Sequence, residues 1–93
     1  MHIGILEATL ELYTSNSLKD KRQVIKSLVE TTRQKFNVSI AEIDDLDSWK
    51  TGRIGVAIVS NDSQHCNRVL DKVLDYWDTN PLFEVSNVGM EID

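Results

Sequence analysis

A chain of 93 residues with 41% hydrophobic and 27% charged side chains has room for one modest core, so residues 1–93 are expected to form a single domain. No apolar run approaches the roughly 20 residues of a membrane span, and no charged leader precedes an apolar segment at the N-terminus. We therefore expect a cytoplasmic protein with no membrane partner. The single cysteine, Cys66, excludes an intrachain disulfide and a cysteine-based zinc cluster.

The net charge of −5 at pH 7 argues against strong, indiscriminate nucleic-acid binding, and no DNA partner is expected. The charge is unevenly distributed. Between Leu18 and Phe36 the chain holds six basic and two acidic residues, whereas the remainder holds four basic and thirteen acidic ones. This asymmetry predicts one basic surface on an acidic body.

The first strand is expected over His2 to Leu12, because apolar and polar residues alternate from Leu6 to Leu12. Ile3 and Ile5 fall on the opposite parity. This change of phase predicts either a β-bulge between Ile5 and Leu6 or a sheet whose second face is also partly covered.

The first helix is expected over about Leu18 to Lys35. Ser17 is the expected N-cap, with Asp20 three residues later as a capping-box-like partner. Asn37 can end the helix, because asparagine tolerates the left-handed conformation of a C-cap. One side of the helical wheel carries the apolar stripe Leu18, Ile25, Leu28, Val29, Thr32 and Phe36.

A second strand is expected over Val38 to Asp44, followed by an acidic, irregular loop from Asp45 to Gly52 that holds Trp49. The third strand, Arg53 to Ser60, is nearly all apolar, which fits a central position covered on both faces. We expect Trp49 to fold back over the sheet or to join a subunit contact.

A second amphipathic helix is expected to begin with its cap at Asn61 or Asp62 and to end before Pro81, which cannot continue a helix. The last strand, Leu82 to Ile92, changes the phase of its alternation. A bulge near Ser86–Asn87 explains the change.

The predicted order, βαββαβ, is typical of an α+β fold, the ferredoxin-like sandwich. It has a four-stranded antiparallel sheet in the order 4-1-3-2 with both helices on one face. The other face is then open, although three strands carry apolar residues on both parities. We expect a partner chain to cover it, most simply in a homodimer, with Ile3, Ile5 and Trp49 as interface candidates.

Three segments carry a family resemblance: SLKDKRQVIKSL, KFNVSIAEIDDLDSWKTGRIGVAIVSND and HCNRVLDKVLDYW. Together they are similar to the YlxP-like family of small uncharacterised bacterial proteins, over nearly the whole chain. The landmarks are the helix-opening S-L-K-acid-K-R and the strand-to-helix junction G-V-A-[IV]-V-S-N-D. The resemblance implies a ferredoxin-like fold and no established activity. Genes of the family are often found near genes for translation initiation and ribosome maturation, which hints at an RNA-related setting and transfers no functional residue.

The basic helix supplies five candidates for contact with an anion or RNA: Lys19, Lys21, Arg22, Lys26 and Arg33. All but Lys21 fall within an arc of about 60° on the wheel, as a stripe that can lie along a phosphate backbone. Lys19, Lys21 and Arg22 also occupy the first turn, where the helix dipole disfavours cations by a few tenths of a kcal/mol. The alternative is a solvated face whose long side chains shield the edge of the core. Aromatic side chains for base stacking are missing among these residues.

No catalytic or metal-binding motif is complete, and no cofactor is expected. Asp44, Asp45 and Asp47 form the only carboxylate cluster, but the spacing of a calcium loop is absent and capping of a turn is the expected role. Cys66 is expected in the core. It cannot pair with His65 as nucleophile and base, because adjacent helical residues point about 100° apart.

Acylphosphatases share this size and fold, but they depend on a glycine-rich phosphate loop with an arginine between the first strand and the first helix. The connection here, Tyr13 to Ser17, has neither residue. We therefore expect a non-enzymatic binding protein whose first helix contacts RNA or a ribosomal particle. The alternative is a dimeric protein-interaction or ligand-sensing module that uses the open sheet face.

Overall fold

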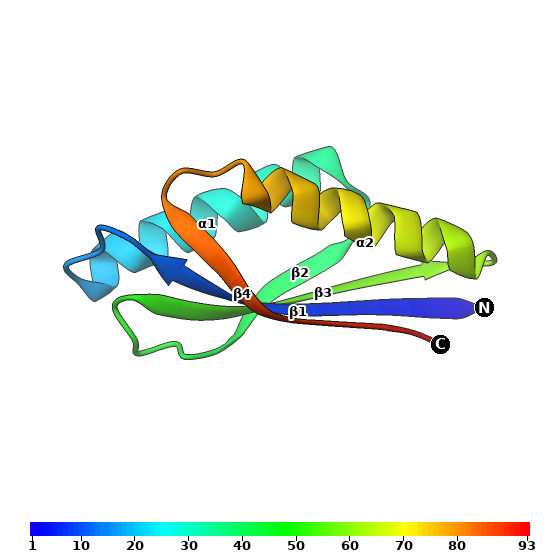
Figure 1. The fold of residues 1–93 in the computed structure, drawn as a ribbon, viewed down its shortest axis with the longest axis horizontal. Coiled ribbons are helices and arrows are strands. Elements are labelled where there is room, and N and C mark those ends of the chain that lie inside the picture. Colours follow the sequence, from blue (N-terminus) through cyan, green and yellow to red (C-terminus); the bar gives the residue numbers. More distant parts are fainter.

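Strands and helices follow one another in the predicted order in the computed structural model, which describes residues 1–93. Their bounds are β1 (His2–Leu12), α1 (Leu18–Lys35), β2 (Ser39–Asp44), β3 (Thr51–Ser60), α2 (Ser63–Asp78) and β4 (Phe83–Ile92). The strands form one antiparallel sheet in the order β2-β3-β1-β4, which is the predicted 4-1-3-2 order read from its other edge. Figure 1 shows both helices on the same side of this sheet, so the ferredoxin-like fold is confirmed.

Alternation along β1 separates the two faces of the sheet. Every even-numbered residue from Gly4 to Leu12 is buried, whereas Ile5 on the other parity is exposed. No bulge interrupts the strand between Ile5 and Leu6, since its pairing with β3 is continuous. Ile3 and Ile5 therefore belong to the second face, and the change of phase reflects apolar residues on both faces.

The predicted bulge in β4 is confirmed. The pairing of β1 with β4 shifts between Glu7 and Thr9, where Gly89 and Ser86 are the respective partners. Asn87 lies in this shift with a φ of 49°, in the left-handed region that asparagine tolerates better than most residues.

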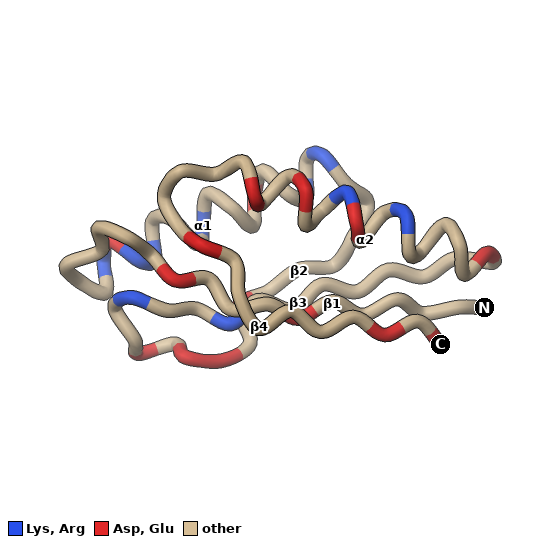
Figure 2. The backbone as a smooth tube through the Cα atoms, in the orientation of Figure 1, with Lys and Arg blue, Asp and Glu red and all other residues tan.

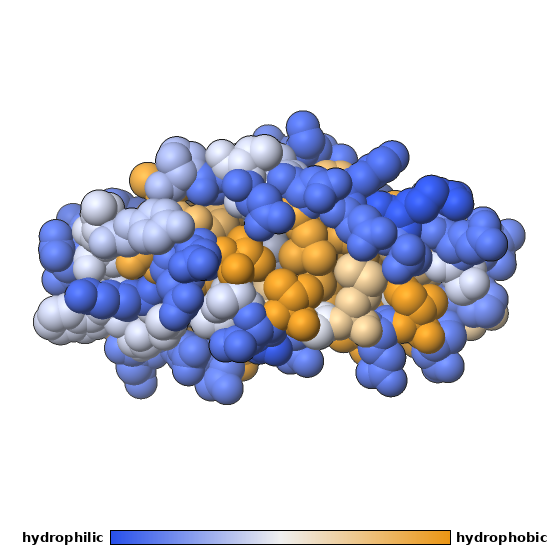
Figure 3. All heavy atoms as spheres, in the orientation of Figure 1, coloured by the Kyte–Doolittle hydropathy of each residue, from blue (hydrophilic) through white to orange (hydrophobic).

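The core lies between the sheet and the helices. Trp77 on α2 is fully buried, and its indole N–H donates a hydrogen bond of 3.1 Å to the Thr32 hydroxyl on α1. Cys66 is buried as predicted, and His65 is exposed. In the view of Figure 3, apolar side chains reach the surface as a band between the helical layer and the sheet. Fifteen buried residues make up this core: Leu6, Ala8, Leu10, Leu12, Ile25, Leu28, Ile40, Ile54, Val56, Ile58, Cys66, Leu70, Val73, Trp77 and Phe83.

Both helices begin at N-caps that the sequence predicts. The Ser17 hydroxyl accepts the backbone N–H of Asp20 at 3.0 Å, as predicted for the N-cap of α1. Asp62 caps α2 in the same way. The C-cap of α1 is Phe36 in extended backbone, so the prediction that a left-handed Asn37 ends the helix is wrong.

The third strand is central in the sheet, but the prediction that both its faces are covered is wrong. Its even-numbered residues from Gly52 to Ile58 are buried under the helices, whereas Arg53, Gly55 and Ala57 are only partly buried on the other side. We call this second side of the sheet the open face. Neither α1 nor α2 combines the length and the apolar character that a membrane-spanning helix needs.

Candidate functional sites on the first helix and the open sheet face

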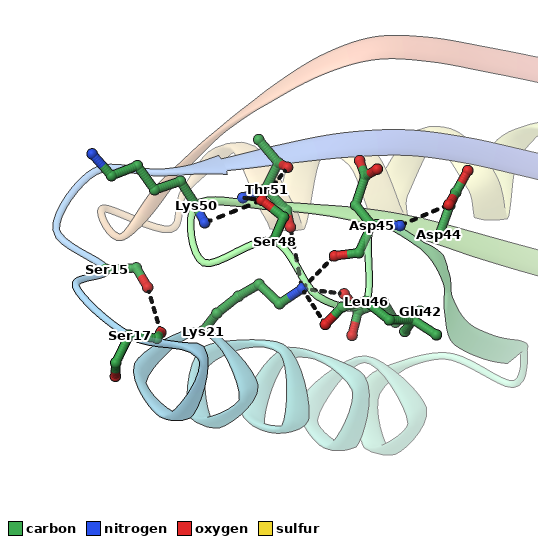
Figure 4. A network of polar contacts seen from close by, with 10 residues as sticks. All are labelled: Ser15, Ser17, Lys21, Glu42, Asp44, Asp45, Leu46, Ser48, Lys50 and Thr51. Atoms are coloured by element: carbon green, nitrogen blue, oxygen red, sulfur yellow. Dashed lines mark hydrogen bonds and ion pairs between the residues drawn. The ribbon is translucent and has the colours of Figure 1, made fainter.

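Lys21, one of the five predicted anion contacts, is not available to any external anion. Its side chain is fully buried, and its ammonium lies 2.8 Å from the Glu42 carboxylate (Figure 4). The same ammonium donates to the backbone oxygens of Asp45 at 2.7 Å, Thr51 at 3.2 Å and Leu46 at 3.3 Å. The prediction for Lys21 is wrong because these oxygens enclose the charge completely.

The network ties the start of α1 to the loop between β2 and β3. Asp45 at the head of this loop has a φ of 61°, a left-handed conformation that turns the chain. Desolvating an ammonium is costly unless it is paired and hydrogen-bonded, and this one has four oxygen acceptors, one of them a carboxylate. The loop therefore explains a cation in the first turn of α1 without an external ligand.

A signal for the burial of Lys21 was present in the sequence. Lys21 precedes Ile25 by four residues, and Leu28 and Thr32 follow at spacings of three and four, so these residues share one face of α1. The same four residues are the buried ones of the helix. Lys21 is therefore a member of the buried stripe of α1, although its charge alone predicts a surface position.

The other four predicted contacts remain on the surface: Lys19, Arg22, Lys26 and Arg33. Three of them line a groove of about 440 Å³ between α1 and the edge strand β2, and Lys19 lies outside it. We call this the basic groove. Its apolar lining consists of Ile25, Val29, Ile40 and Ala41.

None of these four cations is neutralised by a carboxylate. The ion pairs of the protein are Lys21–Glu42 and a surface pair between Arg68 and Asp62 at 3.9 Å. Arg33 donates to the backbone oxygen of Ile40 at 3.0 Å, so it spans the groove and covers an acceptor on the free edge of β2. Its guanidinium keeps further donors for a ligand.

Two carboxylates and no aromatic ring line the basic groove. Glu42 is held by Lys21, and Glu30 is exposed. The two prominent exposed aromatic residues, Tyr13 at 63% and Trp49 at 56%, lie outside the groove. The groove can therefore hold anionic groups along its cations but offers no platform for a base to stack on.

The acidic loop does not assemble a metal site. Asp44, Asp45 and Asp47 are exposed, and no group of three or more acidic, histidine or cysteine side chains is placed to hold an ion. Asp44 instead accepts the backbone N–H of the adjacent Asp45 at 2.8 Å, a local contact at the head of the loop. Trp49 in the same loop is exposed rather than folded over the sheet.

Register places the residues of the open face in rows across the four strands, because directly opposed residues share a face. Three rows run from β2 through β3 and β1 to β4: Ser39–Ala57–Ile5–Glu91, Ala41–Gly55–Glu7–Gly89 and Asp44–Arg53–Thr9–Ser86. A fourth pair, Ile3 opposite Val59, extends the apolar end of the face.

A shallow hollow of about 320 Å³ lies at the apolar end of the open face. Its apolar lining includes Ile5 and Ile43, which are 42% and 47% exposed, and small residues at Ala41, Gly55 and Ala57. A Cβ at Gly55 would lie 3.1 Å from the Ile43 side chain, so glycine there lets Ile43 rest on the sheet. Ile3 and Ile5 are thus on the open face as predicted, and Ile43 is a further residue of this face that was not predicted.

Comparison with known proteins places the chain in a family. A family model described as "Protein of unknown function (DUF503)" matches residues 3–90. The chain belongs to the DUF503 family. Within it, the chain is 38% identical over 82 residues to the uncharacterised protein YlxP of Bacillus subtilis, which covers 88% of this chain and 89% of that protein. The predicted family resemblance is confirmed, and the description of the family states no activity.

Solved structures agree on the fold alone. A de novo designed protein with a ferredoxin fold matches with a TM-score of 0.56 at 9% identity, over 99% of this chain and 85% of that one. A protein of the EAL/GGDEF class from M. capsulatus matches with a TM-score of 0.50 at 13% identity, over 96% of this chain and 62% of that one. Sequence identities this low support a shared architecture and no shared function.

Proposed function

We propose that this DUF503 protein is a cytoplasmic, non-enzymatic binding protein that contacts the phosphate backbone of RNA, including RNA in ribosomal particles. The contact residues are four of the five exposed cations of α1: Lys19, Arg22, Lys26 and Arg33. One observation carries the proposal: these cations are exposed and unpaired along one helix of a protein whose net charge is −5.

Binding by these residues draws its free energy from the release of counterions condensed on the nucleic acid. Arg22 and Lys26 lie on the helix side of the basic groove, and Arg33 bridges to its strand side. Phosphates along the groove would meet a line of cations without desolvating a buried charge. Contacts of this kind position a protein on a backbone and read no sequence.

The acidic remainder of the molecule limits how much nucleic acid can be bound. Thirteen carboxylates lie outside the segment from Leu18 to Phe36. They repel a polyanion that extends far beyond α1, which favours a short RNA segment over a long duplex.

The proposal is tested by co-sedimentation with ribosomal particles at low salt. Reversal of three cations in Lys19→Glu/Arg22→Glu/Lys26→Glu should abolish association while the circular dichroism spectrum stays unchanged. Lys50→Glu/Arg68→Glu/Lys72→Glu is the matched control, because it changes the net charge equally at exposed positions elsewhere. Absence of co-sedimentation, or equal loss in the control, contradicts the proposal.

Protein interaction through the open face is the second candidate function, in a homodimer or with another partner, and a small-molecule sensing role would use the same face. It is favoured by the exposure of Ile5, Ile43 and Val59 on this face, the last at 62%. Exposed aliphatic residues gathered on one face are typical of an interaction surface. Sedimentation velocity of the wild type and of Ile5→Glu measures whether the homodimer forms: a mass that this substitution leaves unchanged contradicts a homodimer through Ile5.

A further inference from the structure

The open face combines an apolar hollow with a border of negative charge. Its only arginine, Arg53, is engaged internally, since it donates to the Thr9 hydroxyl at 3.0 Å and to the Asn87 backbone oxygen at 2.7 Å. The register assigns five exposed carboxylates to the same face: Glu7, Glu11, Asp44, Glu84 and Glu91. Figure 2 shows further acidic residues on the loop that follows β2.

Two of these carboxylates stand directly beside the hollow. Glu91 is opposite Ile5 in the sheet, and Glu7 is opposite Gly55. Neighbouring strands are about 4.8 Å apart, so both carboxylates lie within the reach of a lysine or arginine whose neighbouring side chain occupies the hollow. Neither carboxylate forms an ion pair within the protein.

We propose that the open face docks a basic segment of another protein. An aliphatic side chain of that segment occupies the hollow between Ile5 and Ile43. Lysine or arginine side chains of the segment pair with Glu7 and Glu91. The aliphatic anchor supplies buried apolar area, and the charge pairs fix the orientation and speed the encounter.

Charge distinguishes this occupant from a second copy of the chain. In a symmetric dimer the same patch is presented by both subunits, so the carboxylates around the hollow face a surface with the same excess of carboxylates. The single positive charge of Arg53 cannot neutralise all these carboxylates, and its guanidinium already donates hydrogen bonds to Thr9 and Asn87. Like-charge juxtaposition is destabilising, whereas a basic partner turns the same carboxylates into attractive contacts.

The docking surface is separate from the basic groove. Figure 1 shows α1 and α2 on one side of the sheet, and the hollow lies on the other side. The protein can therefore hold an anionic partner on α1 and a basic partner on the open face at the same time. A failure of either proposal leaves the other standing.

The test uses a short amphipathic helical peptide of leucine, alanine and lysine as the probe. Backbone amide shifts of the full-length protein should map binding to Ile5, Ile43, Gly55 and Ala57. A peptide with glutamate in place of lysine should not bind. A peptide with serine in place of leucine should bind about ten-fold more weakly or worse, because it lacks the anchor.

Protein variants make the test specific for the face. Glu7→Lys/Glu91→Lys should weaken binding about ten-fold or more, whereas Asp71→Lys/Asp75→Lys, the same change in charge on α2, should weaken it far less. Ala57→Phe fills the hollow from the open side and should block the peptide without touching the core. The proposal is overturned if the shifts map elsewhere, if the α2 control weakens binding equally, or if the wild type forms a dimer that Ile5→Glu dissociates.

Discussion

At the scale of single residues, Lys21 is the charged side chain that lies fully buried in the protein. A lysine is rarely fully buried unless it is paired, and this one is both fully buried and surrounded by four oxygen acceptors. Its role is structural, since it links α1 to Glu42 and to the loop after β2. The four candidate RNA contacts are exposed and form no ion pair, although Arg33 donates to the Ile40 backbone oxygen. Their exposure separates them from Lys21.

Removal of the Lys21 ammonium should lower the free energy of unfolding by about 3 kcal/mol, because Glu42 and three backbone oxygens lose their donor. Urea unfolding of Lys21→Met measures the loss. Lys26→Met is the matched control on the exposed side of α1 and should stay within about 0.5 kcal/mol of the wild type. Equal stability of the two variants would show that the network contributes nothing.

At the scale of elements, the two helices are joined through one buried hydrogen bond, from Trp77 to Thr32 at 3.1 Å. Thr32 lies on the apolar stripe of α1, where its methyl group is buried and its hydroxyl accepts the hydrogen bond from the Trp77 indole. The bond holds α1 against α2 together with the contact between the rings of Phe36, which caps α1, and Tyr76 on α2.

Thr32→Val retains the shape of the side chain and leaves the indole N–H without an acceptor. We expect a loss of about 1–3 kcal/mol in the free energy of unfolding, measured by thermal or urea denaturation. Thr31→Val is the control, since its hydroxyl bonds only to the Leu28 backbone oxygen within the same helix. A loss no larger in Thr32→Val than in Thr31→Val would contradict the role given to the hydrogen bond.

The elements themselves were predictable because each depends on a local pattern. Alternation in β1, the Ser17 cap and the bulge at Asn87 are all readable within a few residues. The arrangement of residues on the open face was harder to predict from the sequence. Its rows depend on which residues of different strands lie opposite one another and on a register shift of β2 against β3. This pairing brings Glu7, Glu91 and Ile43 around one hollow. Long-range pairing of this kind leaves no trace in a single strand.

At the scale of the whole molecule, the distribution of charge gives the protein two different sides. The surface cations of α1 lie on the helical side, and the carboxylates of the open face lie on the opposite side of the sheet. A net charge of −5 conceals this separation. Our two proposals use this separation, with an anionic partner at α1 and a cationic partner at the open face.

The central claim is that cations of α1 contact RNA phosphates, and the salt dependence of RNA affinity tests it most directly. Each phosphate contact contributes about −0.7 to the slope of log affinity against log salt for a single strand, so contacts from all four cations give a slope of about −3. Fluorescence anisotropy with a labelled single-stranded RNA measures this slope. For Arg22→Gln/Lys26→Gln the slope should become shallower by about 1.4. Lys50→Gln/Lys72→Gln should leave it unchanged, and a slope that is the same in both variants, or no binding at low salt, contradicts the account.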